Sequence, residues 1–301
     1  MEYQKGAVSP SGSISAGWNN IKDNYWTFFV MTLITGIILF ILSIIFGFIN
    51  SLVVQLTSAA LGTVTQNSGN VGAVSAAVVP QLIAKVIGIF TSIIVLTVSG
   101  VLFCGIYKAL SRQSKGEAAD IGDLFGEFQK IVPCLIVAVI LSLVQFVIEI
   151  IGILTGAAIG VSVIGAGILT SDGKLNPALF GGLFLVIMVF LILYIIVSLI
   201  ISALTSFTYP LIAEQNLSGG QALLLSIKSG LSNFGGLLGL MALLFLMAFG
   251  GFLLCCIGIF FVAPIMSAAL FAAFQSVFGG VTDFRQNTPP PPPNFGNQAG
   301  Y

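Results

Sequence analysis

Two charged residues interrupt otherwise apolar segments of this chain, and they are the first candidates for chemistry. Glu149 is the carboxylate that lies well inside a long apolar segment, and Lys85 lies near the start of another. Charge within hydrocarbon is costly, so such residues usually pair or serve a function. At 1.5 Å per helical residue, Glu149 lies about 27 Å and Lys85 about 33 Å from the cytoplasmic ends of their segments. We expect an intramembrane ion pair, while a titrating or ligand-binding role and separate snorkelling to the interface are alternatives.

Other catalytic chemistry is scarce in this sequence. The chain has no histidine, which excludes histidine bases, histidine metal ligands and histidine-activated nucleophiles. Cys104 and Cys134 are thirty residues apart, and Cys255 and Cys256 are adjacent, so neither pair has the spacing of a metal site. The remaining acidic residues lie mostly in one polar segment, which we interpret as a solvated helix face. The sequence predicts no enzyme activity, no metal and no cofactor.

The elements that position these residues follow from composition. Of 301 residues, 57% are hydrophobic and 7% are charged, with ten basic residues balancing ten acidic ones. Too few charges are present to cover a water-soluble fold. The balance also argues against nucleic-acid binding, and the apolar content argues against disorder. The sequence predicts an all-α polytopic membrane protein whose main partner is the lipid bilayer.

Six segments are long and apolar enough to cross a bilayer, which takes about 20 helical residues. They occupy about residues 25–49, 79–110, 131–160, 178–213, 234–252 and 257–279, within a membrane domain at 25–280. We expect residues 1–24 to form a cytoplasmic N-terminal segment with an interface helix, and residues 281–301 to form a disordered, proline-rich cytoplasmic tail. If both termini are cytoplasmic, eight Lys and Arg residues lie inside and two, Lys85 and Lys174, lie outside. We therefore expect a multi-pass protein of the cell membrane, typical of a bacterial inner membrane.

A short amphipathic segment precedes each odd-numbered span. These segments lie near residues 14–25, 121–130 and 224–231, and such helices typically lie in the membrane interface. Trp18, Tyr25 and Trp26 are expected anchors at headgroup depth. The pattern predicts three units, each an interface helix followed by a helical hairpin. Parallel repeats of this kind occur in transporters, although a shared membrane-insertion pattern without functional meaning is the alternative.

Two stripes of small residues predict helix packing faces. Gly152, Gly156 and Gly160 recur every four residues on the third span, and a serine stripe on the fourth consists of Ser198, Ser202 and Ser206. Such stripes allow close backbone approach and interhelical hydrogen bonds. Packing within one chain is the simpler interpretation, and a homo-oligomer formed through the glycine face is the alternative. Five prolines at 289–293 could bind a protein partner with an aromatic groove, or form a spacer.

The segment 206–279 resembles the six-helix membrane domain of some bacterial glycerophosphoryl diester phosphodiesterases and related membrane proteins. The likeness depends on short motifs, namely Ser206-Phe207, Pro210, Ala222 to Ser226, Asn233-Phe234, and Cys256-x-Gly258 followed by Pro264. In that family, activity belongs to a separate soluble domain with catalytic histidines and acidic metal ligands. The resemblance therefore implies a membrane module and no enzymatic activity.

Two functions remain open from the sequence. The first is a non-catalytic membrane protein that organises the bilayer or contacts lipids through its interface helices. The second is a transporter or carrier of small or amphiphilic substrates. A carrier should have a polar cavity near the bilayer midplane, whereas a dry and fully packed midplane would argue against it.

Overall fold

The computed structural model describes residues 3–65, 69–165, 177–253 and 258–279, and all secondary structure within these ranges is helical. Six helices in the described part of the chain are long and apolar enough to cross a membrane. They are α2 (Tyr25–Thr65), α3 (Gly69–Ser114), α5 (Ile131–Gly165), α6 (Pro177–Thr205), α9 (Phe234–Leu253) and α10 (Gly258–Phe278). The predicted class, an all-α polytopic membrane protein, is confirmed.

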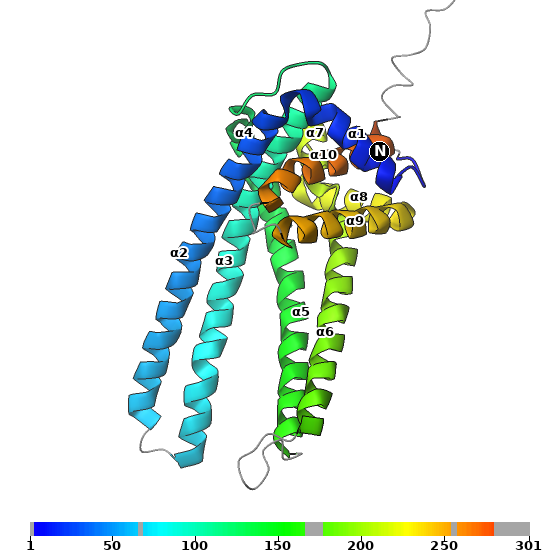
Figure 1. Cartoon of the computed structure of the whole chain (residues 1–301). Helices are drawn as coiled ribbons and strands as arrows, with labels where there is room; N and C mark the ends of the chain where they lie inside the picture. The colour runs from blue at the N-terminus through cyan, green and yellow to red at the C-terminus, as the bar shows by residue number, and fades with distance from the viewer. Residues whose placement is uncertain (1–2, 66–68, 166–176, 254–257, 280–301) are drawn as a thin grey trace, which may run out of the picture.

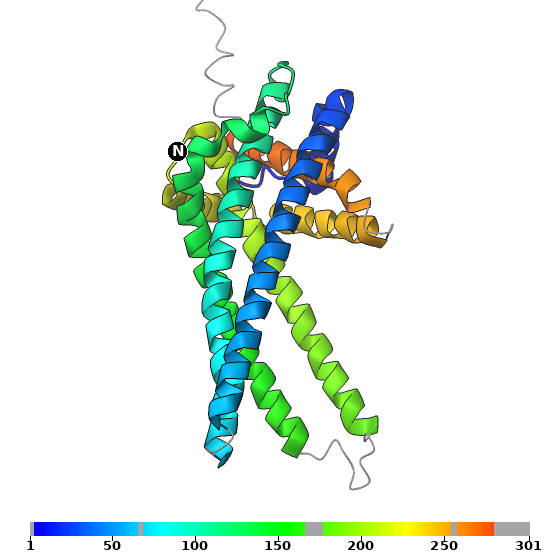
Figure 2. The ribbon, with the colours of Figure 1, turned by 90° about the vertical axis from the view of Figure 1, so that its left-hand side faces the viewer.

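The four longest helices form two hairpins that extend from one end of the molecule (Figure 1). Helices α2 and α3 pack along each other, and α3 also packs against α5. Helix α6 runs apart from α5 in the rotated view, and the far ends of α3 and α5 lie apart in both views (Figures 1 and 2). The two hairpins therefore meet near one end of the molecule and open apart toward the other.

Helices α9 and α10 run across the four long helices rather than along them (Figures 1 and 2). They lie at the end of the molecule that also holds α1 (Pro10–Ile21) and α8 (Gly219–Ser232). Helix α10 packs against α1, α2 and α9, and α9 packs against α6. The six apolar helices therefore do not form one parallel bundle.

The order of a short helix followed by two long ones occurs three times, as α1–α2–α3, α4–α5–α6 and α8–α9–α10, with α7 (Thr208–Gln215) before the third. In the second unit the short element is only α4 (Asp123–Gly126) and a 3₁₀ turn at Phe128–Lys130. The sequence suggested a solvated helix face for the acidic residues of this segment, yet Glu127 is buried together with Lys130. The reason is that they pair with each other at 2.7 Å, and the Lys130 ammonium also donates to the Ala213 carbonyl at 2.5 Å.

The buried core lies at the end where the short helices gather. Its largest fully buried side chains include Phe28 of α2, Leu102 of α3 and Phe271 of α10. Glycine permits the closest helix contact there, because a Cβ on Gly17 of α1 would stand 2.5 Å from the backbone nitrogen of Ala269 in α10. Only a residue without a side chain fits that crossing.

The ends of the helices differ from the bounds of the expected spans at two places. The expected spans at 25–49 and 79–110 leave residues 50–78 between them, yet α2 continues to Thr65 and α3 begins at Gly69. The polar side chains fit the helix because their hydroxyls bond back to its own carbonyls, as Thr57 does to Val53 at 2.7 Å. The expected span at 178–213 is also interrupted, since α6 ends at Thr205 and α7 begins at Thr208. The Ser226 hydroxyl of α8 bridges this break, accepting from Phe207 N and donating to Leu204 O.

Candidate functional site

Lys85 of α3 and Glu149 of α5 lie together. The Lys85 Nζ atom is 2.8 Å from Glu149 Oε2, and the two side chains are 42% and 41% exposed. The bond to Glu149 uses one of the three N–H donors that an ammonium group carries. The pair therefore holds two helices together while both charged groups stay accessible from outside the protein.

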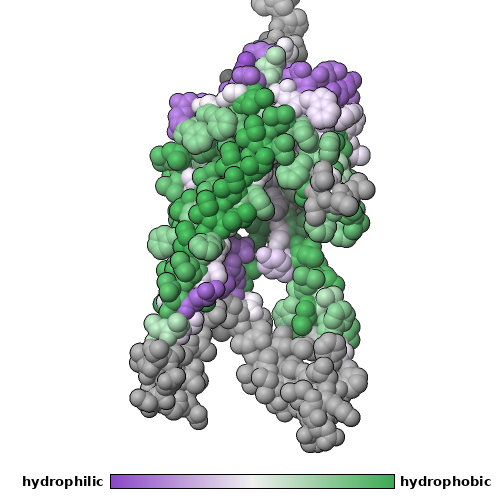
Figure 3. Space-filling view, turned by 60° about the vertical axis from the view of Figure 1, so that its left-hand side comes forward, coloured by the Kyte–Doolittle hydropathy of each residue, from purple (hydrophilic) through white to green (hydrophobic). Residues whose placement is uncertain are grey.

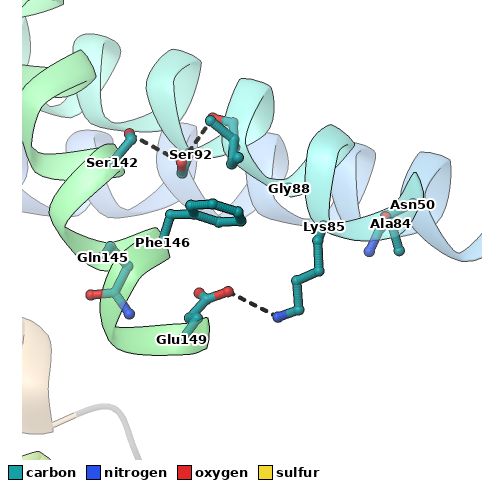
Figure 4. A pocket seen from close by; sticks show the side chains of 10 residues that line it. Asn50, Ala84, Lys85, Gly88, Ser92, Ser142, Gln145, Phe146 and Glu149 are labelled. Atoms are coloured by element: carbon teal, nitrogen blue, oxygen red, sulfur yellow. Dashed lines mark hydrogen bonds and ion pairs between the residues drawn. The ribbon is translucent and has the colours of Figure 1, made fainter. Parts of the chain in front are cut away.

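These two residues belong to a pocket of about 310 Å³ between the α2–α3 hairpin and α5. Helix α3 contributes Lys85, Gly88 and Ser92, and α5 contributes Ser142, Gln145, Phe146 and Glu149, while Asn50 comes from α2 (Figure 4). The helices run antiparallel, so Ser92 meets Ser142 at one end of the pocket and Lys85 meets Glu149 at the other. Repeats of three and four residues place each set on one helix face.

The inner end of the pocket is closed by a hydroxyl pair. The Ser92 hydroxyl oxygen lies 3.1 Å from that of Ser142 and 2.8 Å from the Ile89 carbonyl oxygen, and Ser142 is buried. The Phe146 ring lies between this pair and the ion pair (Figure 4). The pocket thus combines a polar floor, one aromatic wall and a charged mouth.

One polar atom of the pocket lacks a partner among the described residues. The Asn50 side-chain oxygen Oδ1 is buried from solvent and accepts no hydrogen bond. An amide oxygen in this state costs free energy unless a donor reaches it. Asn50 lines the pocket, so a turn of its side chain would bring this oxygen within reach of a donor from a bound molecule.

The start of α5 sets the expected depth of the pocket in a bilayer. The sequence predicts that the third span begins at Ile131, where the exposed apolar residues of α5 also begin. Ser142 lies about 16 Å along α5 from Ile131 and Glu149 about 27 Å. A hydrocarbon core of about 30 Å that α5 enters at Ile131 would place the pocket between the midplane and the membrane edge remote from α1. In the space-filling view, hydrophilic residues reach the surface between the apolar long helices and also gather at the end that holds α1 (Figure 3).

The small-residue stripes are only partly within the described side chains. A Cβ on Gly152 would meet no atom from beyond its own helix region within 4 Å, and the surroundings of Gly156 and Gly160 lie outside the described side chains. On α6, Ser202 is exposed, Ser198 is half-buried, and the half-buried Ser206 follows the helix end. The Ser206 hydroxyl donates to Ala203 O at 2.9 Å, a local bond. The contacts described at these positions do not test the two predicted packing faces, which therefore stay predictions.

The aromatic residues expected at headgroup depth form a cluster at the junction of α1 and α2. The Trp18 and Tyr25 ring centroids are 5.8 Å apart, and so are those of Tyr25 and Trp26. The Tyr25 hydroxyl donates to the Phe261 carbonyl of α10 at 2.7 Å, while Trp26 is 68% exposed. Tyr25 therefore ties α2 to α10, and Trp26 faces outward.

Cys104 and Cys134 illustrate a contact that linear spacing conceals. Their sulfur atoms lie 3.9 Å apart between α3 and α5, both side chains are buried, and both are free thiols. Within the described residues, no group of three or more histidine, cysteine or acidic side chains could hold a metal ion.

Comparison of the chain with protein-family models, curated proteins and solved structures finds no match.

Sequence reasoning found the charged mouth of the pocket and missed its other polar residues. The signal was present, because Lys85, Gly88 and Ser92 share the three-and-four spacing of Ser142, Gln145 and Glu149. Asn50 gave no such signal. Its place at the pocket depends on how far α2 continues beyond the expected span, and only the fold shows this.

Proposed function

We propose that this chain is a non-catalytic carrier of small amphiphilic molecules in a cell membrane. The observation that supports the proposal is the polar pocket between α3 and α5. It would begin near the bilayer midplane, at Ser142, in a hydrocarbon core that α5 enters at Ile131. A protein that only organises the bilayer needs no such cavity. A carrier needs one, because the polar part of its substrate must be bound within hydrocarbon.

The shape of the molecule agrees with a substrate that enters from the membrane. The α2–α3 and α5–α6 hairpins open apart away from the packed end, where α1, α8, α9 and α10 gather (Figures 1 and 2). Exposed apolar residues of α3 and α5, among them Phe90 and Val147, offer surface for hydrocarbon chains beside the polar pocket. An amphiphile can therefore keep its chains in lipid while its polar part enters the pocket.

The proposed topology has both termini in the cytoplasm, since eight of the ten Lys and Arg residues then lie on that side. The mouth of the pocket then faces the outer leaflet. The lack of histidine supports a role without catalysis. The resemblance of residues 206–279 to the phosphodiesterase-associated membrane domain stays a prediction, and it implies no activity for this chain.

Leaflet exchange in proteoliposomes tests the proposal. The probe is a phospholipid mixture with a nitrobenzoxadiazole label on one acyl chain, and dithionite destroys only the label in the outer leaflet. Wild-type protein should speed the loss of the protected fraction. Gly88→Leu should return the rate to that of protein-free vesicles, because a Cβ at Gly88 meets no atom within 4 Å and the larger side chain can occupy the pocket.

Gly47→Leu provides the matched control. Gly47 is also a helical glycine at which an added Cβ would meet no atom within 4 Å, and it is absent from the pocket lining. This variant should exchange lipid like wild type. Equal exchange by wild type, Gly88→Leu and empty vesicles would contradict the carrier proposal.

A further inference from the structure

The charges of the pocket specify a class of ligand. Lys85 supplies a cation and Glu149 a carboxylate, and without a ligand they neutralise each other at 2.8 Å. A ligand with both an anion and a cation can exchange partners with this pair and leave the site neutral. A ligand with a single charge would leave one side chain unpaired within the membrane, which is costly.

Asn50 narrows the choice of cationic group on the ligand to one that carries N–H donors. Its buried Oδ1 accepts no hydrogen bond within the described structure and needs an N–H or O–H donor. A primary ammonium group carries three N–H donors, enough for Glu149 and for Asn50 once the Asn50 side chain turns its buried oxygen toward the pocket. A trimethylammonium group carries none, so it could approach Glu149 but could not satisfy Asn50.

Lys85 is suited to bind the anionic group of the ligand. Its ammonium has further N–H donors beyond the one bonded to Glu149, and it can bind a phosphate as a compact positive charge. The ion pair lies at the mouth of the pocket. In the membrane placement proposed above, this is the depth where the headgroups of the remote leaflet begin. Phe146 and Ile89 give the pocket an apolar side that can contact the glycerol and upper acyl carbons.

We propose that the pocket binds an amino-phosphate zwitterion, the chemistry of an ethanolamine phospholipid headgroup, with phosphate on Lys85 and primary ammonium on Glu149 and Asn50. The inference rests on the same pocket as the carrier function but needs no transport. Binding without leaflet exchange would refute the carrier and keep the site. Exchange without headgroup selectivity would refute the site.

Lipid competition tests this assignment. The full chain is reconstituted into nanodiscs holding equal amounts of phosphatidylethanolamine, phosphatidylcholine and phosphatidylglycerol, then released, and its retained lipid is identified by mass spectrometry. Wild type should retain phosphatidylethanolamine roughly tenfold over phosphatidylcholine, the scale of one charge-assisted hydrogen bond. Retention of the three lipids in nanodisc proportions would overturn the proposal.

Three variants separate the roles of the residues. Asn50→Leu keeps the volume and removes the acceptor, so the preference over phosphatidylcholine should fall while the protein stays folded. Glu149→Gln leaves Lys85 as a lone cation and should shift retention toward phosphatidylglycerol. Lys85→Gln should lower retention of all three phospholipids. Unchanged selectivity in all three variants would show that the lipid binds elsewhere.

A soluble headgroup distinguishes the two sources of this chemistry. Glycerophosphoethanolamine carries the same charges without acyl chains. If the ligand is a membrane lipid, millimolar glycerophosphoethanolamine should not displace the retained phosphatidylethanolamine. Complete displacement would assign the pocket to a water-soluble zwitterion and refute its assignment to the lipid.

Discussion

Lys85 and Glu149 show how two charges can remain within apolar segments. Each would be costly alone in hydrocarbon, yet together they bridge α3 and α5 over 2.8 Å. Their partial exposure allows a ligand to compete for either partner. The same two residues can therefore serve both stability and binding.

Removing one charge of the Lys85–Glu149 pair should destabilise the protein more than swapping the two charges between α3 and α5. Glu149→Gln or Lys85→Gln leaves one unpaired charge, and each should lower the free energy of unfolding by about 1 kcal/mol, a modest value because both side chains are partly exposed. The double variant Lys85→Glu with Glu149→Lys restores an ion pair and should recover most of the loss. Thermal unfolding in nanodiscs measures these effects. A double variant that is no more stable than the worse single variant would show that the pair contributes no coupling.

At the scale of elements, the packed end depends on the crossing of α1 over α10. Gly17 lies at this crossing, where any side chain would collide with the backbone of Ala269. The crossing joins the first and third units of the chain and helps to hold α10 across the long helices.

Gly17→Ala should therefore destabilise the packed end. A Cβ would stand 2.5 Å from Ala269 N, and the backbone on both sides must shift. We expect a loss of about 1–3 kcal/mol, the usual cost of overpacking, measured by thermal unfolding. Gly235→Ala in α9 is the control, because its Cβ meets no atom within 4 Å and alanine favours the helix. Equal stability of both variants would contradict the described crossing.

The sequence allowed the elements to be predicted better than their arrangement. Apolar length and composition correctly predicted six apolar helices, because these properties depend on the solvent that surrounds each segment. The direction of α9 and α10 could not be predicted, since a 20-residue apolar helix has the same composition along or across its neighbours. The burial of Lys130 was also missed, because its partner Ala213 lies 83 residues away and offers a backbone carbonyl.

The candidate site was predictable in part for a similar reason. Charged residues are rare inside apolar segments, so the sequence alone marks Lys85 and Glu149 as candidates. Ser92, Ser142 and Gln145 are common in membrane helices and acquire meaning only when α3 and α5 are placed side by side. Asn50 lies just beyond the expected end of the first span, so nothing in its surroundings marked it as part of a site.

At the scale of the whole molecule, the protein has a packed end and an open end. Helices α1, α8, α9 and α10 gather at the packed end, and the two long hairpins open apart at the other (Figure 1). This asymmetry places the pocket on the open side. It also places the helix end at Leu253 at the depth of α8 rather than at the far tips of α2 and α3.

Cysteine labelling tests this asymmetry. In a chain whose four native cysteines are replaced by alanine, Leu56→Cys on α2 should react with a membrane-impermeant maleimide added to the side opposite the termini. Phe252→Cys at the end of α9 should not react from that side. Both positions are well exposed on the protein surface, so access depends on depth in the membrane. Reaction of Phe252→Cys from the side opposite the termini would contradict the crosswise placement of α9.

The central claim is that an amphiphile occupies the pocket between α3 and α5, and the mass of the intact protein released from nanodiscs tests it most directly. Wild type and Gly47→Leu should each retain one amphiphile, whereas Gly88→Leu should appear without it because leucine occupies the same space. If all three proteins retain the same amount of lipid, or none, the pocket is not the binding site and the central claim is wrong.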